Sequence, residues 1–327
     1  MERRAFGNTG LEISSIVFGA GAVGGGVFRG AEAQRLGTVR RAREGGINWI
    51  DTAPGYGDGQ SEENLGWILE QLEWQPNLST KLRLRAEELD DIPGAARRSI
   101  EESLGRMRQP AVQVIQLHNR VRREGDLESG SLGIDDVLGP GGVADAFDEL
   151  REAGFAWFSG FTAFGDVDVL YELVASGRFQ AMQAYHNLLN PSMTRPLPPA
   201  FSAENYRQLA RAASQRGIGV LNIRVLAAGA LAGQPARSGG FAMSPGSEPD
   251  RDLARAALVD TALEGEPGTP AQRAIRFALG QPGISGVLVG FSNPEQVDDA
   301  LAATELPPLS DGALQRLEAL YESDFAG

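Results

Sequence analysis

The sequence predicts an α/β protein, namely a (β/α)8 TIM barrel with an N-terminal β-hairpin and an extra C-terminal helix. Short apolar segments rich in Val, Ile, Leu and Ala alternate eight times with segments of helical periodicity, which is typical of a closed parallel barrel. No low-complexity linker divides the chain, so we expect one domain over residues 1–327. The hydrophobic content of 42% is sufficient for the core of such a barrel.

The elements are expected in the repeated order strand, loop, helix. Residues 1–15 should form a hairpin that caps the barrel, because Asn8-Thr9-Gly10 offers a turn between two short alternating segments. The eight strands are expected at 16–20, 47–51, 78–81, 112–118, 156–162, 181–187, 219–224 and 286–291. The helices are expected at 32–45, 61–72, 92–108, 142–153, 166–176, 203–216, 269–280 and 294–303, and the extra helix at 310–323.

Residues 225–267 are the longest departure from this pattern. They are rich in Gly, Pro and Ser and predict a long loop after the seventh strand, and loops of this length are usually functional or mobile. We expect this loop, residues 119–139 and the tail after residue 310 to shape a pocket at one end of the barrel. Candidates to line the pocket are Phe28, Trp49 and Tyr185.

The composition limits which classes of partner the protein is expected to bind and where in the cell it is expected to be. The formal net charge of −13 disfavours binding to nucleic acid or to an anionic membrane, and an anionic ligand would need a local positive site. The absence of cysteine excludes disulfides and thiol chemistry, and with only two histidines no metal site is expected. No apolar run is long enough for a membrane span and no secretory signal is visible, so we expect a cytoplasmic protein.

A glycine motif after the first barrel strand raises an alternative fold. Residues 19–24, GAGAVG, match the GxGxxG pattern of a dinucleotide-binding doubly wound sheet, and Asp51 follows near the end of the next strand. That fold requires a helix that begins within the motif, whereas residues 25–30 continue as a glycine-rich loop. The pattern therefore favours a glycine-rich loop at a barrel mouth.

Four chemically distinctive side chains fall at or just after the ends of neighbouring predicted strands. Asp51 ends the second strand and Tyr56 follows it in the loop, Lys81 ends the third strand, and His118 ends the fourth. Lys81 is the only lysine among 30 basic residues. Because parallel strands of a barrel deliver their carboxyl ends to one mouth, we expect a carboxylate, a phenol, an ammonium and an imidazole to meet there.

These residues stand in longer motifs that resemble the aldo-keto reductase family over essentially the whole chain. The motifs are Asp51-Thr52-Ala53, Tyr56-Gly57, Ser61-Glu62 with Leu65-Gly66, Ser79-Thr80-Lys81 and Gln116-Leu117-His118. The resemblance implies an oxidoreductase that transfers hydride between NAD(P)(H) and an aldehyde or ketone or its alcohol. It also implies a catalytic tetrad of Asp51, Tyr56, Lys81 and His118.

Physical chemistry supports these roles. Reduction of a carbonyl leaves an alkoxide that needs a proton, and Tyr56 can donate one. A neighbouring ammonium stabilises phenolate and so makes the phenol a stronger acid; Lys81 would do this, held by an ion pair with Asp51. His118 would donate a hydrogen bond to the substrate oxygen, while the hydride belongs to the cofactor.

The resemblance also implies a set of cofactor-binding positions, with departures from the family pattern. Gln183 matches the glutamine that binds the nicotinamide carboxamide, but the usual Ser-Asn is Thr162-Ala163; Thr162 could instead cap the following helix. After the seventh strand an aliphatic residue replaces the usual aromatic ring, and Arg224 takes a serine position, where it would contact pyrophosphate, face the substrate or form a structural salt bridge. The full predicted set is Gly21, Thr162, Gln183, Ile223, Arg224, Leu226, Gly229, Gly290, Ser292 and Gln296.

The identity of the cofactor depends on the eighth strand and the helix that follows it. Ser292 or Asn293 can cap that helix and Pro294 suits its first turn, which makes its N-terminus a candidate phosphate site. The Lys and Arg that hold a 2′-phosphate in other members align with Gly290 and Gln296. Members with the Ser/Gln variant commonly use NADP(H), so we favour NADP(H) and keep NAD(H) as the alternative.

Two other functions remain open. One is an NAD-dependent sugar (aldose) dehydrogenase, and the other is a nicotinamide-binding regulatory or redox-sensing subunit with little turnover. The substrate is expected to be a small carbonyl or alcohol, and a homo-oligomer is possible.

Overall fold

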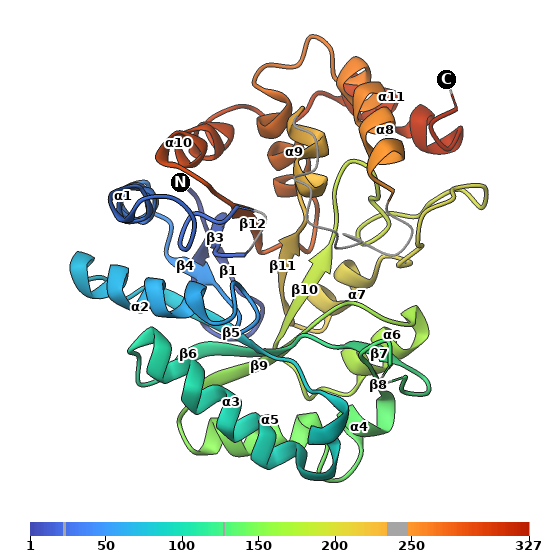
Figure 1. Cartoon of the computed structure of the whole chain (residues 1–327). Coiled ribbons are helices and arrows are strands. Elements are labelled where there is room, and N and C mark those ends of the chain that lie inside the picture. Colours follow the sequence, from blue (N-terminus) through green and yellow to red (C-terminus); the bar gives the residue numbers. More distant parts are fainter. Residues whose placement is uncertain (22–23, 127, 234–247, 327) are drawn as a thin grey trace.

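The computed structural model describes residues 1–21, 24–126, 128–233 and 248–326. Eight parallel strands form a closed barrel in the order β10-β11-β12-β3-β4-β5-β6-β9, which confirms the predicted fold class (Figure 1). The strands are β3 (Ile16–Gly19), β4 (Trp49–Asp51), β5 (Asn77–Leu82), β6 (Val112–Leu117), β9 (Ala156–Thr162), β10 (Ala181–Tyr185), β11 (Gly219–Ile223) and β12 (Gly286–Gly290).

Helices surround the strands on the outside of the barrel (Figure 1). One follows each barrel strand: α1 (Glu32–Glu44), α2 (Gln60–Leu72), α3 (Ile92–Met107), α5 (Val143–Glu152), α6 (Val167–Ala175), α7 (Leu209–Gln215), α9 (Pro270–Leu279) and α10 (Pro294–Ala303). The predicted extra helix is α11 (Asp311–Glu322). Within the described part of the chain, no helix has both the length and the apolar character needed to cross a membrane.

The start of α1 decides between the two readings of the glycine motif. The chain leaves β3 at Gly19, and among the described residues that follow, the first helix is α1, which begins at Glu32. Gly24 approaches the end of β12 so closely that a Cβ added there would lie 2.5 Å from the backbone nitrogen of Phe291. The glycines therefore serve close packing at the barrel mouth, and the doubly wound alternative is wrong.

The N-terminal hairpin closes the opposite end of the barrel. Strands β1 (Arg3–Ala5) and β2 (Glu12–Ser14) pair antiparallel as predicted. Phe6, between them, is fully buried and its ring centroid lies 4.9 Å from that of Trp49. Trp49, a candidate to line the pocket, instead packs in the floor of the barrel with Phe6, Val17, Val114 and Leu221.

Residues 225–267 are not one long loop. The described part contains a 3-10 turn, η2 (Ala227–Ala232), and a helix, α8 (Pro249–Ala262), while residues 234–247 lie outside the described residues. Helix α8 has Pro249 in its first turn and buries Ala256 and Val259. It packs against η2 and α11, so this segment adds a helical layer above the barrel (Figure 1).

Two other segments also differ from the prediction. The helix expected at 203–216 covers only α7, because Arg207 and Gln208 adopt φ values of 50° and 64°, outside the helical region. The expected loop at 119–139 contains a small parallel pair, β7 (Arg120–Arg122) and β8 (Ser131–Gly133), and the short helix α4 (Ile134–Leu138). A 3-10 turn, η1 (Ala86–Asp91), precedes α3.

The floor of the barrel gives the first testable prediction. Phe6→Ala removes a fully buried ring and should lower the free energy of unfolding by about 3–5 kcal/mol, measured by urea denaturation. The matched control is Trp157→Ala, an aromatic that is 54% exposed, which should change stability by less than about 0.5 kcal/mol. Equal effects of the two substitutions would mean that Phe6 does not hold the floor.

Candidate active site

The four predicted catalytic side chains meet at the C-terminal end of the barrel. Asp51, Tyr56 and His118 line one pocket there. Lys81 lies among them and is only 1% exposed. Strand register explains the convergence, because Asp51 of β4 pairs with Ser79 of β5, and Lys81, two residues further along the same face of β5, pairs with β6 just before His118.

A buried ion pair joins the second and third barrel strands. The Nζ of Lys81 lies 2.6 Å from Oδ2 of Asp51 and also donates to the carbonyl oxygen of Thr52 at 2.7 Å. Burial alone would lower the pKa of Lys81, but the Asp51 carboxylate and the Tyr56 phenol outweigh it, so the pKa is raised. Lys81 therefore carries a permanent positive charge inside the site.

Further donors surround the Asp51 carboxylate. Its Oδ1 accepts hydrogen bonds from Ser79 Oγ at 2.7 Å and from Gln183 Nε2 at 2.7 Å. Ser79 Oγ in turn accepts from Trp49 Nε1 at 3.0 Å. Ser79 is not among the site residues expected from the sequence, although it lies two residues before Lys81 and so on the same face of the strand. This network fixes the carboxylate at the centre of the barrel.

Tyr56 lies in the loop between β4 and α2, over the ion pair. The Nζ of Lys81 is 4.8 Å from the centroid of the Tyr56 ring. The ring meets that of His118 edge-on, with 6.1 Å between centroids. Gly21, a predicted cofactor residue, lies against the same ring, since a Cβ added there would be 3.5 Å from it. The phenol thus has the ammonium on one side and the imidazole on another.

His118 follows β6 directly and is half-buried. Burial, together with the charges of Lys81, Arg83 and Arg224, lowers the pKa of His118 to about 3. The imidazole is therefore neutral near pH 7 and can donate a hydrogen bond through one ring N–H. It can orient a substrate oxygen without competing with Tyr56 as the source of the proton.

Unpaired polar atoms near the tetrad fit a nicotinamide carboxamide. The Thr162 hydroxyl and Gln116 Oε1 are buried and have no hydrogen-bond partner among the described residues. Thr162 does not cap α6, whose N-cap residue is Asp166. Gln183 Nε2 is engaged by Asp51, which leaves its carbonyl oxygen to accept from an amide. A hydroxyl and two amide groups can thus hold a ligand amide here.

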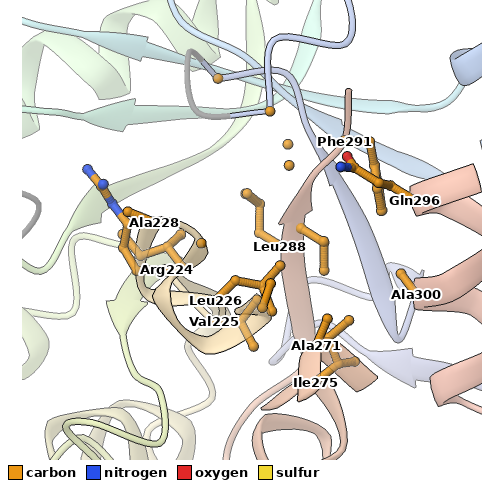
Figure 2. A pocket seen from close by; sticks show the side chains of 18 of the residues that line it. Arg224, Val225, Leu226, Ala228, Ala271, Ile275, Leu288, Phe291, Gln296 and Ala300 are labelled. Carbon is orange, nitrogen blue, oxygen red and sulfur yellow. The ribbon is translucent and has the colours of Figure 1, made fainter. Parts of the chain in front are cut away.

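The turn after β11 forms one wall of the pocket. The expected cofactor residues of this segment, Ile223, Arg224, Leu226 and Gly229, all line the pocket. Arg224 has φ of 63°, and its carbonyl oxygen accepts from Nδ2 of Asn187 at 2.9 Å. Figure 2 shows the Arg224 side chain directed away from Leu226 and Val225, on the opposite side of the pocket from Gln296.

The far end of the pocket lies between β12 and α10. The expected cofactor residues Gly290, Ser292 and Gln296 line it together with Asp299 and Ala300. Figure 2 shows Gln296 and Ala300 on this side of the pocket. Ser292 Oγ donates to the carbonyl of Gly24 at 2.6 Å, and Gln296 Oε1 accepts from the Ser292 backbone at 2.7 Å. Of the two residues expected to cap α10, Ser292 and Asn293, the N-cap is Asn293. Its Oδ1 accepts a hydrogen bond from the backbone N–H of Gln296 at 2.9 Å.

Comparisons with known proteins match this chain over nearly its whole length. The model of the Aldo/keto reductase family matches residues 15–322. An L-galactose dehydrogenase of Arabidopsis thaliana is 31% identical over 98% of this chain and 95% of its own length. A probable voltage-gated potassium channel subunit beta of the same plant is 24% identical over 99% of this chain and 97% of its own length. An aldo-keto reductase from Bacillus halodurans, solved in its holo form, has the same fold, with a TM-score of 0.73, 20% identity, and coverage of 98% and 96% of the two chains.

The second histidine gives a prediction about acid stability. His186 is fully buried and stacks on Phe277 at 5.4 Å, and neither ring nitrogen has a hydrogen-bond partner among the described residues. Burial and the charge of Arg195 lower the pKa of His186 from 6.5 to about 3. Between these values only the unfolded chain binds the proton, so this residue destabilises the fold as pH falls from 6.5 towards 3.

His186→Phe should remove this penalty. We compare the free energy of unfolding of the variant with that of the unsubstituted protein, measured by urea denaturation at pH 7.5 and at pH 4.5. This difference should be more favourable to the variant at pH 4.5 than at pH 7.5 by roughly 2–3 kcal/mol. The measurement at pH 7.5 accounts for any packing cost of the new ring. An unchanged difference at the two pH values would show that His186 does not titrate as described.

Proposed function

Because this chain belongs to the aldo-keto reductase family, an NAD(P)-dependent oxidoreductase family, we propose that the groups around Lys81 interconvert a carbonyl and its alcohol. The observation that carries the proposal is the buried ammonium of Lys81, 2.6 Å from the Asp51 carboxylate and 4.8 Å from the centroid of the Tyr56 ring. A buried cation paired on one side and facing a phenol on the other favours proton transfer by that phenol.

Each residue of the tetrad has its own task in the proposal. When bound, the nicotinamide cofactor supplies or accepts the hydride. Tyr56 donates a proton to the substrate oxygen in reduction and accepts one in oxidation. Lys81 stabilises the phenolate that reduction leaves behind, and Asp51 holds Lys81 in place.

His118 completes the proposed mechanism as a neutral hydrogen-bond donor. The Tyr56 and His118 rings are nearly perpendicular, with 6.1 Å between their centroids, so both residues can reach one substrate oxygen. A donor aimed at the oxygen stabilises the negative charge that develops there. Thr162, Gln116 and Gln183 would hold the carboxamide of the nicotinamide ring from the side of the barrel core.

The choice between the two dinucleotides depends on the charge around the adenosine ribose. The sequence favours NADP(H) through the Ser/Gln variant of the family. Around Ser292 and Gln296, however, the described lining includes the carboxylate of Asp299 and neither Lys nor Arg. A carboxylate repels a 2′-phosphate and suits a free 2′-hydroxyl. We therefore propose NAD(H) as the preferred cofactor and NADP(H) as the weaker one.

Two alternatives have specific support. The relative at 31% identity, an L-galactose dehydrogenase, favours an aldose as the physiological substrate. The relative at 24% identity, a probable potassium channel subunit beta, favours a regulatory subunit. The assembled tetrad supports catalysis over a purely regulatory role. One domain over residues 1–327, a cytoplasmic location and a possible homo-oligomer stay predictions from the sequence.

The proposed function is tested by titrating the purified protein with NADH and NADPH, followed by cofactor fluorescence. Small aldehydes are then added with the reduced cofactor, and aldoses with the oxidised one. We expect tighter binding of NADH and aldehyde-dependent oxidation of the cofactor. Tighter binding of NADPH would overturn the charge argument, and cofactor binding without turnover of any aldehyde or aldose would favour the regulatory subunit.

Tyr56→Phe tests the proton donor directly. The variant keeps the ring and should bind cofactor normally, but it should reduce aldehydes about 10²- to 10⁴-fold more slowly because only the acidic group is lost. The matched control is Tyr171→Phe, whose hydroxyl donates to the carbonyl of Arg207 away from the pocket and whose loss should leave turnover unchanged. Turnover of the Tyr56 variant within about twofold of the control would remove Tyr56 from the mechanism.

A further inference from the structure

Arg224 combines two features that cost free energy. Its backbone has φ of 63°, a conformation that a long side chain rarely adopts, and the Asn187 side chain holds its carbonyl oxygen at 2.9 Å. Its guanidinium is half-buried, and burial lowers the pKa of Arg224. Strain and partial desolvation at one residue of a pocket wall are typical of a functional position.

The guanidinium belongs to the end of the pocket where the chemistry takes place. Arg224 lines the same pocket as Tyr56 and His118, and its charge acts on both. In Figure 2 its side chain extends away from Gln296 and Phe291, which mark the adenosine end. Of the three roles expected from the sequence, contact with substrate therefore fits better than contact with pyrophosphate.

A second cation stands at the same mouth. Arg83 follows β5, two residues after Lys81, and is exposed. Its charge also contributes to the lowered pKa of His118. The charges of Lys81, Arg83 and Arg224 all act on the imidazole. In a chain of net charge −13, this is the local positive site that an anionic ligand requires.

We propose that Arg224 binds an anionic group of the carbonyl substrate, a carboxylate or a phosphate, at a point separate from the reacting oxygen. The planar guanidinium can grip such a group through two parallel hydrogen bonds, and Arg83 attracts it at the rim. The strained backbone sets the direction of the side chain, so Arg224 selects the substrate while Tyr56 and His118 act on the carbonyl. This inference rests on the proposed function for its substrate, but not for the binding of the anion.

The kinetic test uses two aldehydes of matched shape, 4-carboxybenzaldehyde and its neutral methyl ester. The unsubstituted protein should have the higher kcat/KM for the carboxylate. Arg224→Gln should lower kcat/KM for the carboxylate about 10- to 100-fold more than it lowers kcat/KM for the ester, and the difference should lie mainly in KM. Arg224→Lys should restore part of the lost kcat/KM, because lysine keeps the positive charge but lacks the two parallel N–H donors of the guanidinium.

The matched control is Arg85→Gln. Arg85 is exposed, follows the same strand as Arg83 and pairs only loosely with Glu87 at 3.7 Å. Its replacement removes the same charge without touching the described pocket lining, so it should change neither aldehyde by more than about twofold. A loss in the control equal to that of Arg224→Gln would mean that net charge alone, and not Arg224, selects the substrate.

A binding measurement that needs no turnover completes the test. With the oxidised cofactor present, calorimetry should show benzoate binding more tightly than neutral benzamide, and Arg224→Gln should abolish the difference. Inorganic phosphate in place of benzoate distinguishes a phosphate site from a carboxylate site. Equal effects of Arg224→Gln on both aldehydes would overturn the inference and indicate that Arg224 binds a neutral polyol. Weaker cofactor binding in this variant would also overturn it and would indicate that Arg224 binds the pyrophosphate.

The two proposals fail in different ways. If the neutral ester is reduced and no preference depends on Arg224, the anion site is wrong and the oxidoreductase stands. If neither aldehyde is reduced but benzoate binding depends on Arg224, the anion site stands and the proposed substrates are wrong.

Discussion

The ion pair between Lys81 and Asp51 is the interaction on which the rest of the site depends. Two charges that are 1% and 2% exposed would be costly to remove from water if either lacked partners. The Thr52 carbonyl accepts a hydrogen bond from the ammonium, and Ser79 and Gln183 donate hydrogen bonds to the carboxylate. Removal of one partner from such a pair typically destabilises a protein by about 3–5 kcal/mol. The pair is therefore both a structural joint between strands and the source of the charge that acts on Tyr56.

The ion pair also links the two ends of the barrel. The Phe6 ring of the hairpin packs on Trp49, whose indole N–H binds Ser79, which in turn binds Asp51. This line of contacts passes from the floor through the core to the mouth. The parallel register of β4 and β5 sets its geometry, because it places Asp51 beside Ser79 and two residues from Lys81. The hairpin that closes the floor thus supports the orientation of the groups that we propose to be catalytic.

Residue patterns in the sequence predict the barrel and the tetrad, because both depend on local signals. Each strand ends close to a turn or helix signal in the sequence. A residue at the carboxyl end of a parallel strand lies at the mouth of the barrel, as His118 does. The departures came from the tertiary structure. Helix α8 has an alanine-rich buried face next to a Gly- and Pro-rich segment, so its composition resembled that of a loop. The positive φ of Arg207 and Gln208 shortened α7, and Arg224 in the pocket wall also has a positive φ. No periodicity in the sequence indicates such backbone conformations.

Because Lys81 is buried, the chemical reactivity of its amine can report how often the barrel opens. The sequence has no other lysine, and the ammonium of this one is shielded by the barrel and held by Asp51. A lysine-directed acylating reagent can therefore reach a side-chain amine only in molecules whose barrel has opened. With the reagent in excess, the rate of acylation at this single position would count opening events under native conditions, without denaturant and without an introduced label. Lys81, which the proposed mechanism requires, would thus also measure how often the barrel opens.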